Sequence, residues 1–503
     1  MSAISRGIVS AVLLAARRLT SRSVNLQGYA PLLRALYVQG LAALCLLACI
    51  GEAAAQLPAP LAAALEEARI PENAVAVWVQ DPAETTPLLA LNGDRPMNPA
   101  SVIKLVTTFT ALEALTPAYR WHTEIYGDRP PIDGRLRGNL YIKGYGDPRI
   151  TLETLWLWLR ELRGRGLREV DGDLVLDRSF FDLAPDDPGA FDGQPLKPYN
   201  AGPDALLIDF RSRRLTVLPQ GDTLRLALDV DAPGVKLVNR LTPVAGPCGD
   251  WENGLATRVE RGRGRITVSI EGPYPLACGE QAWHLALFDG NTQWETLFRA
   301  LWSELGGRWR GKVTEGTVPG AAHLIARFES PPLTEVVRDI NKFSNNVMAR
   351  QLYLSLGAEL LGPPATLKKA EQASLAVLAS RGLDFLELAL GNGSGLDRST
   401  RISARHLALL LERAQRSLWY PEFAASLPLV GLDGTLRRRH VGEPLAGQAR
   451  LKSGSLHDVR ALAGYLRTAA GRDVIVVCLV NYPDAARARP FQDALLRWVF
   501  ETR

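Results

Sequence analysis

The sequence predicts a mixed α/β (α+β) protein, in which an antiparallel sheet flanked by helices is accompanied by inserted β-rich domains. Three observations predict this fold class. Strand-like runs stand near both ends of the chain, helical periodicity returns after residue 293, and short β-like runs separated by Gly, Pro and Asp fill residues 121–293. The length of 503 residues and the hydrophobic content of 47% allow a large core and more than one domain.

Residues 1–55 are predicted to form a signal peptide. Leu41–Ile50 is a short uncharged apolar run, and Ala53–Ala55 supply the small residues that suit a signal-peptidase site, so the mature chain would begin near Gln56. The run is shorter than the about 20 apolar residues that a membrane-spanning helix needs, and no other segment approaches that length. We therefore expect an exported, periplasmic protein without a stable membrane span. A lipoprotein anchored through Cys49 is the less favoured alternative.

Residues 56–120 are expected to form the first part of the main domain. They contain an amphipathic helical pattern, two strand-like runs and a second helical pattern, namely LAAALEEARI, AVAVWVQD, PLLALNGD and VIKLVTTFTALEAL. Asn98 and Pro99 precede the last pattern as a cap residue and a first-turn proline. Ser101 is therefore predicted in the first turn of a buried helix.

Residues 121–293 are expected to be one or two β-rich domains inserted into the main domain, which resumes over residues 294–503. The β-like runs include RLRGNLYIKG, GDLVLD, LRLALDV and GRITVSIEG. Cys248 and Cys278 lie in Pro/Gly-rich loops, and their positions are consistent with a disulfide bridge in an oxidising compartment. Cys478 is predicted to be a buried, inert thiol within an apolar strand.

The last part of the chain combines helices with three strand candidates. The helical patterns are TQWETLFRALWSEL, TEVVRDINKFSNNVMARQLYLSLG, LKKAEQASLAVLASRG and ISARHLALLLERAQ. The strand candidates are RLKSGS, VRALAGYLRT and DVIVVCLVNY, and a helix is expected from Asp484. These strands are expected to join those near the other chain end in one antiparallel sheet.

Charge and composition argue against several classes of function. The net charge is +5, from 58 Lys and Arg against 53 Asp and Glu, and no basic arm indicates nucleic-acid binding. The run Arg437–Arg439 is interpreted as a solvated face that at most attracts an acidic substrate. No CxxC or His/Cys cluster has metal-ligand spacing, so we expect no metal and no cofactor.

Three short motifs carry the predicted chemistry: Ser101–Lys104, Ser344–Asn346 and Lys452–Gly454. Residues three apart share a helix face, so the Lys104 amine can reach the Ser101 hydroxyl. A serine becomes a good nucleophile when a neutral amine accepts its proton, and burial or a second cation lowers the pKa of a lysine. Ser101 and Lys104 are therefore the predicted nucleophile and base.

The other motif residues complete this predicted site. Lys452 is the candidate second cation, and Gly454 is expected to leave room for a substrate backbone. Ser344 is expected to pass a proton to the leaving amine, and Asn346 to hold Lys104 and the substrate. The backbone N–H groups of Ser101 and Ser455 are the expected oxyanion donors.

The three motifs in this order resemble those of penicillin-binding proteins and class A β-lactamases. More specifically, nearly the whole mature chain resembles the D-alanyl-D-alanine carboxypeptidase/endopeptidase family of low-molecular-mass class C penicillin-binding proteins, the S13 peptidases. The matching stretches are NPASVIKL, GNLYIKGYGDP, PYNAGPDALLIDF, INKFSNNVMARQL, NGSGLDRSTRIS, GLDGTLRRR and LKSGSLHDVRALAGYL.

The resemblance implies a transpeptidase-like fold with two inserted domains and an acyl-enzyme on Ser101. It also implies peptidoglycan stem peptides that end in D-Ala-D-Ala, or are cross-linked through D-Ala, as substrates, and β-lactams as covalent inhibitors. Lys452-Ser453-Gly454 departs from the commoner Lys-Thr-Gly but keeps the hydroxyl at Ser453. Asn392 stands where the family usually has Asp, which leaves an acidic role there in question.

Three alternatives compete with this interpretation. A triad of Ser455, His457 and Asp458 is disfavoured because neighbouring residues on a strand point to opposite faces, so His457 and Asp458 are better explained as turn residues. A β-lactamase would share the acylation chemistry, but the long insert and the lack of a deacylation glutamate motif count against it. A non-catalytic cell-wall binding module is disfavoured because all three motifs are intact.

Overall fold

The computed structural model describes residues 57–231, 234–262 and 265–502. The predicted signal peptide, its cleavage site and Cys49 lie outside these residues. Within the described part of the chain, no helix is long and apolar enough to cross a membrane.

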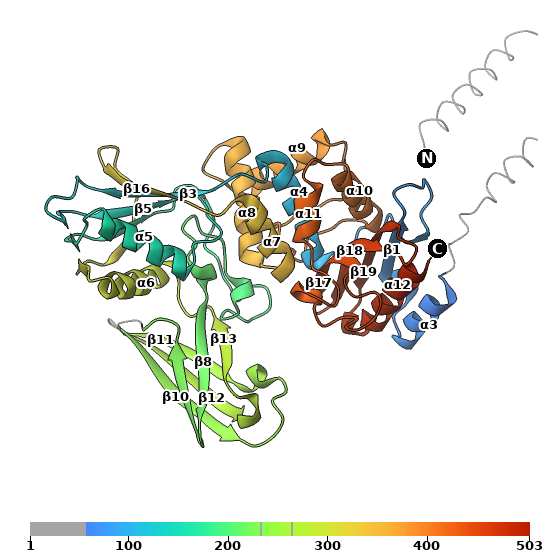
Figure 1. Cartoon of the computed structure of the whole chain (residues 1–503), viewed down its shortest axis with the longest axis horizontal. Helices are drawn as coiled ribbons and strands as arrows, with labels where there is room; N and C mark the ends of the chain where they lie inside the picture. Colours follow the sequence, from blue (N-terminus) through green and yellow to red (C-terminus); the bar gives the residue numbers. More distant parts are fainter. Residues whose placement is uncertain (1–56, 232–233, 263–264, 503) are drawn as a thin grey trace, which may run out of the picture. The chain divides into compact units, whose positions relative to one another are not determined.

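One five-stranded antiparallel sheet combines strands from near both ends of the described chain (Figure 1). Its strand order is β17-β18-β19-β1-β2. The strands are β1 (Val75–Gln80), β2 (Leu89–Leu91), β17 (Ala449–Leu456), β18 (Val459–Arg467) and β19 (Asp473–Asn481). The expected sheet is therefore confirmed, and it places β17, which carries Lys452, at one edge.

Both faces of this sheet are covered, which explains the continuous apolar sequence of its inner strands. Alternate residues along β19 belong to two different cores, as Val477 and Cys478 do. Helices α3 (Ala59–Glu67) and α12 (Arg489–Glu501) form the core that contains Cys478, and they lie side by side in Figure 1. Burial raises the pKa of the Cys478 thiol to about 12, so it holds little thiolate at neutral pH.

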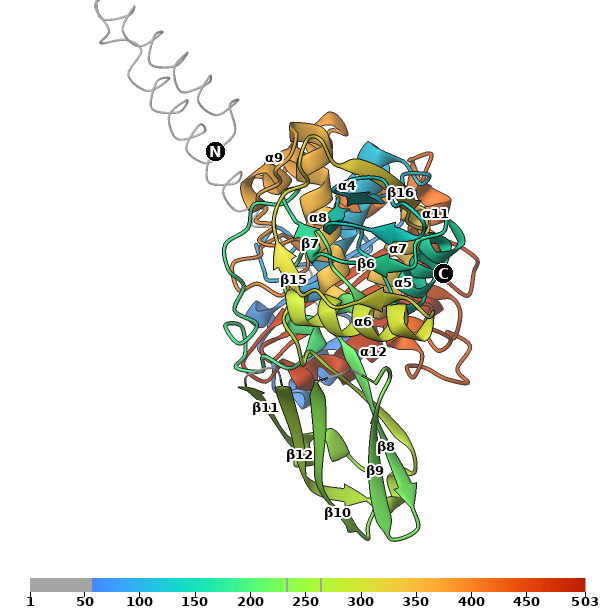
Figure 2. The ribbon, with the colours of Figure 1, turned by 90° about the vertical axis from the view of Figure 1, so that its left-hand side faces the viewer.

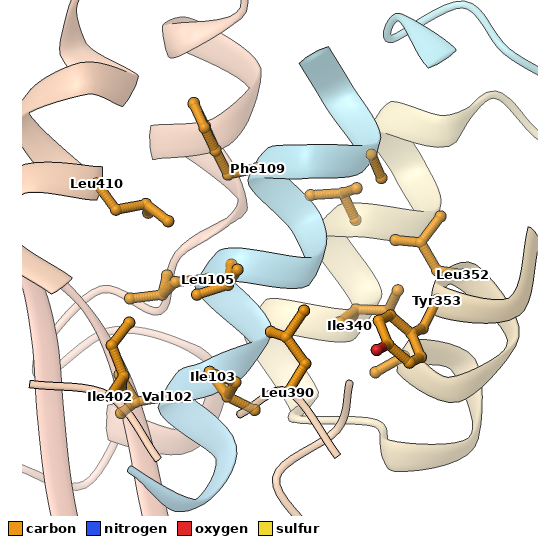
Figure 3. Close-up of a cluster of buried hydrophobic side chains, with 14 of the residues drawn as sticks. Val102, Ile103, Leu105, Phe109, Ile340, Leu352, Tyr353, Leu390, Ile402 and Leu410 are labelled. Carbon is orange, nitrogen blue, oxygen red and sulfur yellow. The ribbon is translucent and has the colours of Figure 1, made fainter. Parts of the chain in front are cut away.

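The other core surrounds helix α4 (Lys104–Leu115), which follows the 3-10 helix η2 (Ala100–Ile103). Residues 104–112 of α4 are all buried, because the helix projects apolar side chains such as Leu105 and Phe109 into a core that also contains Ile340 and Leu410 from other helices (Figure 3). The other helices that contribute to this core are α7 (Leu333–Phe343), α8 (Asn346–Leu361), α9 (Leu367–Ser380), α10 (Ala404–Gln415) and α11 (Tyr420–Ser426).

The segment between the Ser101–Lys104 and Ser344–Asn346 motifs begins and ends in a second set of sheets. Their strand orders are β15-β7-β5-β3-β16 and β14-β6-β4. The strands are β3 (His122–Gly127), β4 (Arg135–Leu136), β5 (Leu140–Gly144), β6 (Glu169–Val170), β7 (Leu174–Asp177), β14 (Arg308–Trp309), β15 (Val313–Glu315) and β16 (His323–Glu329). Because β14 to β16 pair with strands of the predicted insert, its sheets continue past residue 293, and the division into domains stays a prediction.

Two helices pack into the core of these sheets, and one of them was not predicted. Helix α6 (Gly290–Glu304) matches a predicted helical pattern, whereas α5 (Leu152–Gly164) lies in the region interpreted as β-rich. Its buried residues, Leu155, Trp158, Leu159 and Leu162, follow helical spacing, and the Thr151 side chain caps its first turn. This periodicity is the signal that could have identified α5.

Two further three-stranded sheets, β13-β8-β9 and β10-β12-β11, share a hydrophobic core (Figure 2). Their strands are β8 (Arg213–Gln220), β9 (Thr223–Leu228), β10 (Val235–Val244), β11 (Ala256–Gly262), β12 (Arg265–Pro275) and β13 (Gln281–Leu285). The Cys248–Cys278 disulfide is present in this region, as the loop positions of the two cysteines suggested. The remaining 3-10 helices are η1 (Glu72–Ala74), η3 (Pro198–Asn200), η4 (Asp209–Arg211), η5 (Trp251–Gly254), η6 (Leu276–Cys278), η7 (Gly434–Leu436) and η8 (Ala485–Ala488).

Candidate active site

Ser101 and Lys104 lie at the start of the buried helix, but the local structure differs from the predicted first α-helical turn. Ser101 belongs to η2, and Lys104 is the first residue of α4. The turn is held by the Asn98 side chain, whose Oδ1 accepts a hydrogen bond from Ala100 N at 2.8 Å, while Ala100 adopts a left-handed φ of 46°. The Lys104 Nζ atom lies 2.9 Å from Ser101 Oγ, as the spacing of the motif predicted.

Lys104 has two further partners, and both are pure acceptors. Its Nζ atom lies 2.7 Å from Asn346 Oδ1 and 2.5 Å from the Ser394 carbonyl oxygen. The Asn346 Nδ2 group donates to the Tyr199 carbonyl at 3.1 Å, which fixes the amide with its oxygen toward Lys104. A neutral amine has two N–H groups and one lone pair. Its N–H groups can therefore serve the two acceptors, and its lone pair can accept the proton of the Ser101 hydroxyl.

The Ser344–Asn346 motif interrupts the long helical pattern predicted around it. Helix α7 ends at Phe343, and Ser344 adopts the left-handed conformation with a φ of 58°. The side chain of Asn345 then accepts a hydrogen bond from Met348 N at 3.1 Å and caps α8, of which Asn346 is the first residue. This junction directs the Ser344 hydroxyl and the Asn346 amide to two different lysines.

Lys452 is buried on β17 and contacts the second motif. Its Nζ atom donates to Ser344 Oγ at 2.9 Å and to the Ser453 carbonyl at 2.7 Å. The Ser453 side chain lies on the opposite face of the strand from Lys452, with its Oγ 2.8 Å from Thr435 Oγ1. Ser455 is exposed. The structure thus brings all three predicted motifs together.

The structure shows a steric reason for a glycine at position 454. A Cβ atom at this position would lie 2.5 Å from the Pro99 carbonyl oxygen and 3.1 Å from Ser101 N. The turn that carries Ser101 therefore lies where the Cβ of another residue would be, and the expected room for a substrate backbone stays a prediction. The glycine is required because β17 packs closely against η2.

The surroundings of Lys104 and Lys452 lower the pKa values of both amines, for partly different reasons. Burial, the charge of Lys452 and the charge of Arg350 together hold the pKa of the Lys104 amine well below its ordinary value of 10.5. Burial also lowers the pKa of Lys452, to about 7. Both shifts favour the neutral amine, and at Lys104 the two nearby cations add to the effect of burial.

The Ser394 carbonyl, which accepts a hydrogen bond from Lys104, is a site group that sequence reasoning missed. Asn392 Oδ1 accepts hydrogen bonds from Ser394 N at 3.1 Å and Ser394 Oγ at 2.7 Å, and its Nδ2 donates to the Leu396 carbonyl at 3.0 Å. Gly395 has a φ of 80°, and a Cβ there would lie 2.0 Å from the Ala100 carbonyl oxygen. The alternating glycines of this loop were the available signal of a close approach.

The rival serine triad is not assembled. His457 and Asp458 form the turn between β17 and β18, and His457 is exposed. The Asp458 carboxylate instead forms an ion pair with Arg398 at 2.7 Å. Among the described residues, no group of three His, Cys, Asp or Glu side chains could hold a metal ion.

Comparison with known proteins agrees with this geometry. The model of the D-Ala-D-Ala carboxypeptidase 3 (S13) family matches residues 57–502. The D-alanyl-D-alanine carboxypeptidase of Actinomadura sp. (strain R39) is 29% identical over 423 residues, which are 80% of this chain and 77% of that protein. The D-alanyl-D-alanine carboxypeptidase DacB of Haemophilus influenzae is 26% identical over 412 residues, which are 78% and 81% of the two chains.

The fold is shared with a solved structure. Penicillin binding protein 4 of Haemophilus influenzae superposes with a TM-score of 0.73 at 22% identity, over 88% of this chain and 99% of that one. A second structure of that protein, in complex with a β-lactam, gives a TM-score of 0.70 at 22% identity, over 88% and 100% of the two chains. The likeness covers the transpeptidase-like fold together with the segments inserted in it. On the family match, the chain belongs to the D-Ala-D-Ala carboxypeptidase 3 (S13) family of serine-type carboxypeptidases.

Proposed function

We propose that Ser101 is the nucleophile and Lys104 the general base of a reaction that cleaves the peptide bond after D-alanine in peptidoglycan stem peptides. The observation that carries this proposal is the buried Lys104 amine, which lies 2.9 Å from Ser101 Oγ while two pure acceptors occupy its other contacts. A serine hydroxyl next to a neutral, desolvated amine is an activated nucleophile.

Acylation follows from this arrangement. The Ser101 oxygen attacks the carbonyl carbon of the penultimate D-alanine as its proton passes to Lys104 Nζ. The backbone N–H groups of Ser101 and Ser455 are proposed to stabilise the oxyanion. Their proximity is supported by the close packing of Gly454 against the turn of Ser101. The C–N bond then breaks, and an ester forms on Ser101.

The leaving amine needs a proton, and Ser344 is proposed to supply it. Lys452 donates a hydrogen bond to Ser344 Oγ, so the Ser344 hydroxyl proton is free to point toward the leaving nitrogen. Lys104 then returns the proton it took, through Ser344. In deacylation, Lys104 accepts a proton from water, the water oxygen attacks the ester carbonyl, and Ser101 leaves with that proton.

Ser453 and Ser455 are proposed to bind the carboxylate of the terminal residue by hydrogen bonds, and Lys452, on the other face of the strand, to attract it through its charge. A cationic amine and two hydroxyl groups along one strand match the charge and the acceptors of a carboxylate. The same site would bind β-lactams as covalent inhibitors, because these present a reactive amide next to a carboxylate. The β-lactam complex of the Haemophilus influenzae protein supports this proposal for the present chain.

The proposed substrate is outside the cytoplasm, so the proposal includes export through the predicted leader and a periplasmic location. The names of the two curated relatives support D-alanyl-D-alanine peptides as the substrate class. Cleavage of cross-links through D-alanine is part of the same proposal, because it requires the same bond to be attacked.

Labelled penicillin tests the proposal. We expect a long-lived adduct on Ser101 in the full chain, and release of D-alanine from a stem pentapeptide. Ser101→Ala should abolish both with the fold intact, whereas the control Ser380→Ala, at the end of α9, should retain both. Rapid turnover of the adduct would indicate a β-lactamase, and absence of any adduct would indicate a binding module. Release of D-alanine by Ser101→Ala would refute the nucleophile assignment.

A further inference from the structure

A pocket of about 490 Å³ lies along β17, next to the proposed carboxylate site. Side chains alternate along a strand, so Lys452 reaches Ser344 while Ser453 and Ser455 line the pocket. The α12 side of the sheet closes it through Leu462 and Gln492. A leaving residue held at the two serine hydroxyls would therefore extend directly into this pocket.

The pocket is strongly cationic. The described residues that line it include four arginines and no aspartate or glutamate, namely Arg438, Arg439, Arg460 and Arg489. Arg439 is buried and already neutralised, because its guanidinium is paired with Asp493. Of the other three, only Arg489 has an ion pair among the described residues, a long one of 4.0 Å with Asp493, so positive charge remains available there.

These three arginines differ in the hydrogen bonds and ion pairs that their guanidinium groups form. Arg460 donates to the carbonyls of Leu456 and Val459, which fixes its guanidinium beside the β17–β18 turn. Arg489 has a side chain 63% exposed and reaches Asp493 only at 4.0 Å. The exposed Arg438 side chain makes no hydrogen bond or ion pair with any of the residues that the structure describes. Arg438, which has no partner among the described residues, and the mostly exposed Arg489 can thus both contact an incoming anion.

We propose that this pocket binds a second carboxylate, carried by the leaving residue in addition to its terminal carboxylate. This inference rests on the proposed function and deepens it. Lys452, Ser453 and Ser455 account for one carboxylate, and the guanidinium groups of Arg438 and Arg489 match another through paired hydrogen bonds. The enzyme then prefers peptides in which an acidic residue follows the scissile D-alanine bond.

Matched substrates test this preference in the full chain. The substrates are peptides of one sequence that end in D-Ala-D-Glu or in D-Ala-D-Gln, which have the same shape and differ in charge. We expect kcat/KM to be about ten-fold higher for the D-Glu peptide, because each partly exposed charge pair contributes up to about five-fold. The preference should shrink as ionic strength rises.

Variants assign the preference to the pocket. Arg438→Gln and Arg489→Gln should each lower the D-Glu over D-Gln ratio by about three-fold, and the double variant should bring it near one. The control is Arg437→Gln, because Arg437 is an exposed arginine of the same loop that does not line the pocket. Its ratio should equal that of the unmodified chain.

The outcomes separate this inference from the function it rests on. A penicillin adduct on Ser101 in each variant shows that fold and nucleophile are intact. With that adduct present, equal rates for the two peptides, or an equal loss of preference in Arg437→Gln, would overturn the inference alone. If the unmodified chain forms no adduct and releases no D-amino acid from either peptide, both the proposed function and this inference are refuted.

Discussion

The start of α4 and the strand β17 each bury one lysine in the same site, yet the two regions give their lysines different properties. Lys104 faces two fixed acceptors, a serine hydroxyl and the charges of Lys452 and Arg350. Lys452 faces a hydroxyl and a single carbonyl, and burial lowers its pKa only to about 7. Burial alone therefore does not define a base. The neighbouring cations Lys452 and Arg350 add to burial in lowering the pKa of Lys104, whereas burial alone lowers that of Lys452.

The largest expected effect comes from removing the base. Lys104→Met keeps the length of the side chain and removes the amine, so acylation of Ser101 by penicillin should fall by about 10³-fold. Rapid-quench measurement of adduct formation gives this rate, and circular dichroism reports whether the fold is retained. If a folded Lys104→Met variant is acylated at the normal rate, the roles assigned to the two lysines are wrong.

Removing the second lysine should have a smaller and more selective effect. Lys452→Met should lower kcat/KM by about 10²-fold for peptides with a free terminal carboxylate, because it removes the cation that attracts the carboxylate together with the charged hydrogen bond to Ser344, and such a bond contributes about 1.5–3 kcal/mol. The loss should be smaller for the same peptides with an amidated terminus. Equal losses for the two substrates would mean that Lys452 does not recognise the carboxylate.

The packing of the Ser394 loop against the turn that precedes α4 can be tested at Gly395. In Gly395→Ala, the new Cβ would lie 2.0 Å from the Ala100 carbonyl oxygen, so the loop must move and its Ser394 carbonyl must leave Lys104. We expect about a ten-fold loss of acylation rate. Gly382→Ala is the matched control, because its φ of 75° is similar and nothing lies within 4 Å of the added atom. Equal rates in the two variants would refute the role of the loop.

The smallest expected effect is at Asn392. In Asn392→Asp, the carboxylate can still accept from Ser394 but can no longer donate to the Leu396 carbonyl. The free energy of unfolding should fall by about 1 kcal/mol, and acylation by less than about three-fold. Urea unfolding and penicillin acylation measure the two quantities. A loss of acylation as large as that of Lys104→Met would assign Asn392 a direct part in the chemistry.

Much of this site was predictable because the relative positions of several of its side chains follow from the spacing of residues within one helix or strand. The spacing of Ser101 and Lys104 on a helix, and the alternation along β17, depend on regular local geometry. The Ser394 and Tyr199 carbonyls could not be predicted, because a backbone carbonyl has no residue-type signature and its position depends on loop packing. The contact between Gly454 and Pro99 could not be predicted for the same reason, since only the folded chain brings the two residues together.

The fold likewise contains elements that could be predicted from local sequence patterns and elements that could not. Strands buried on both faces, such as β19, were identified from continuous apolar runs. Helix α5 was missed because its surroundings were interpreted as uniformly β-rich, although its own periodicity was clear. The continuation of the inserted sheets to β16 could not be predicted either, because strand partners so distant in sequence leave no local pattern.

The pH dependence of Ser101 acylation by penicillin, measured between about pH 5 and pH 10, tests the central claim most directly. A neutral Lys104 amine predicts acylation that is already fast near neutral pH, with a decline above about pH 7 as Lys452 loses its proton. A rate that instead rises about ten-fold for each pH unit toward 10.5, the ordinary value for a lysine, would contradict it.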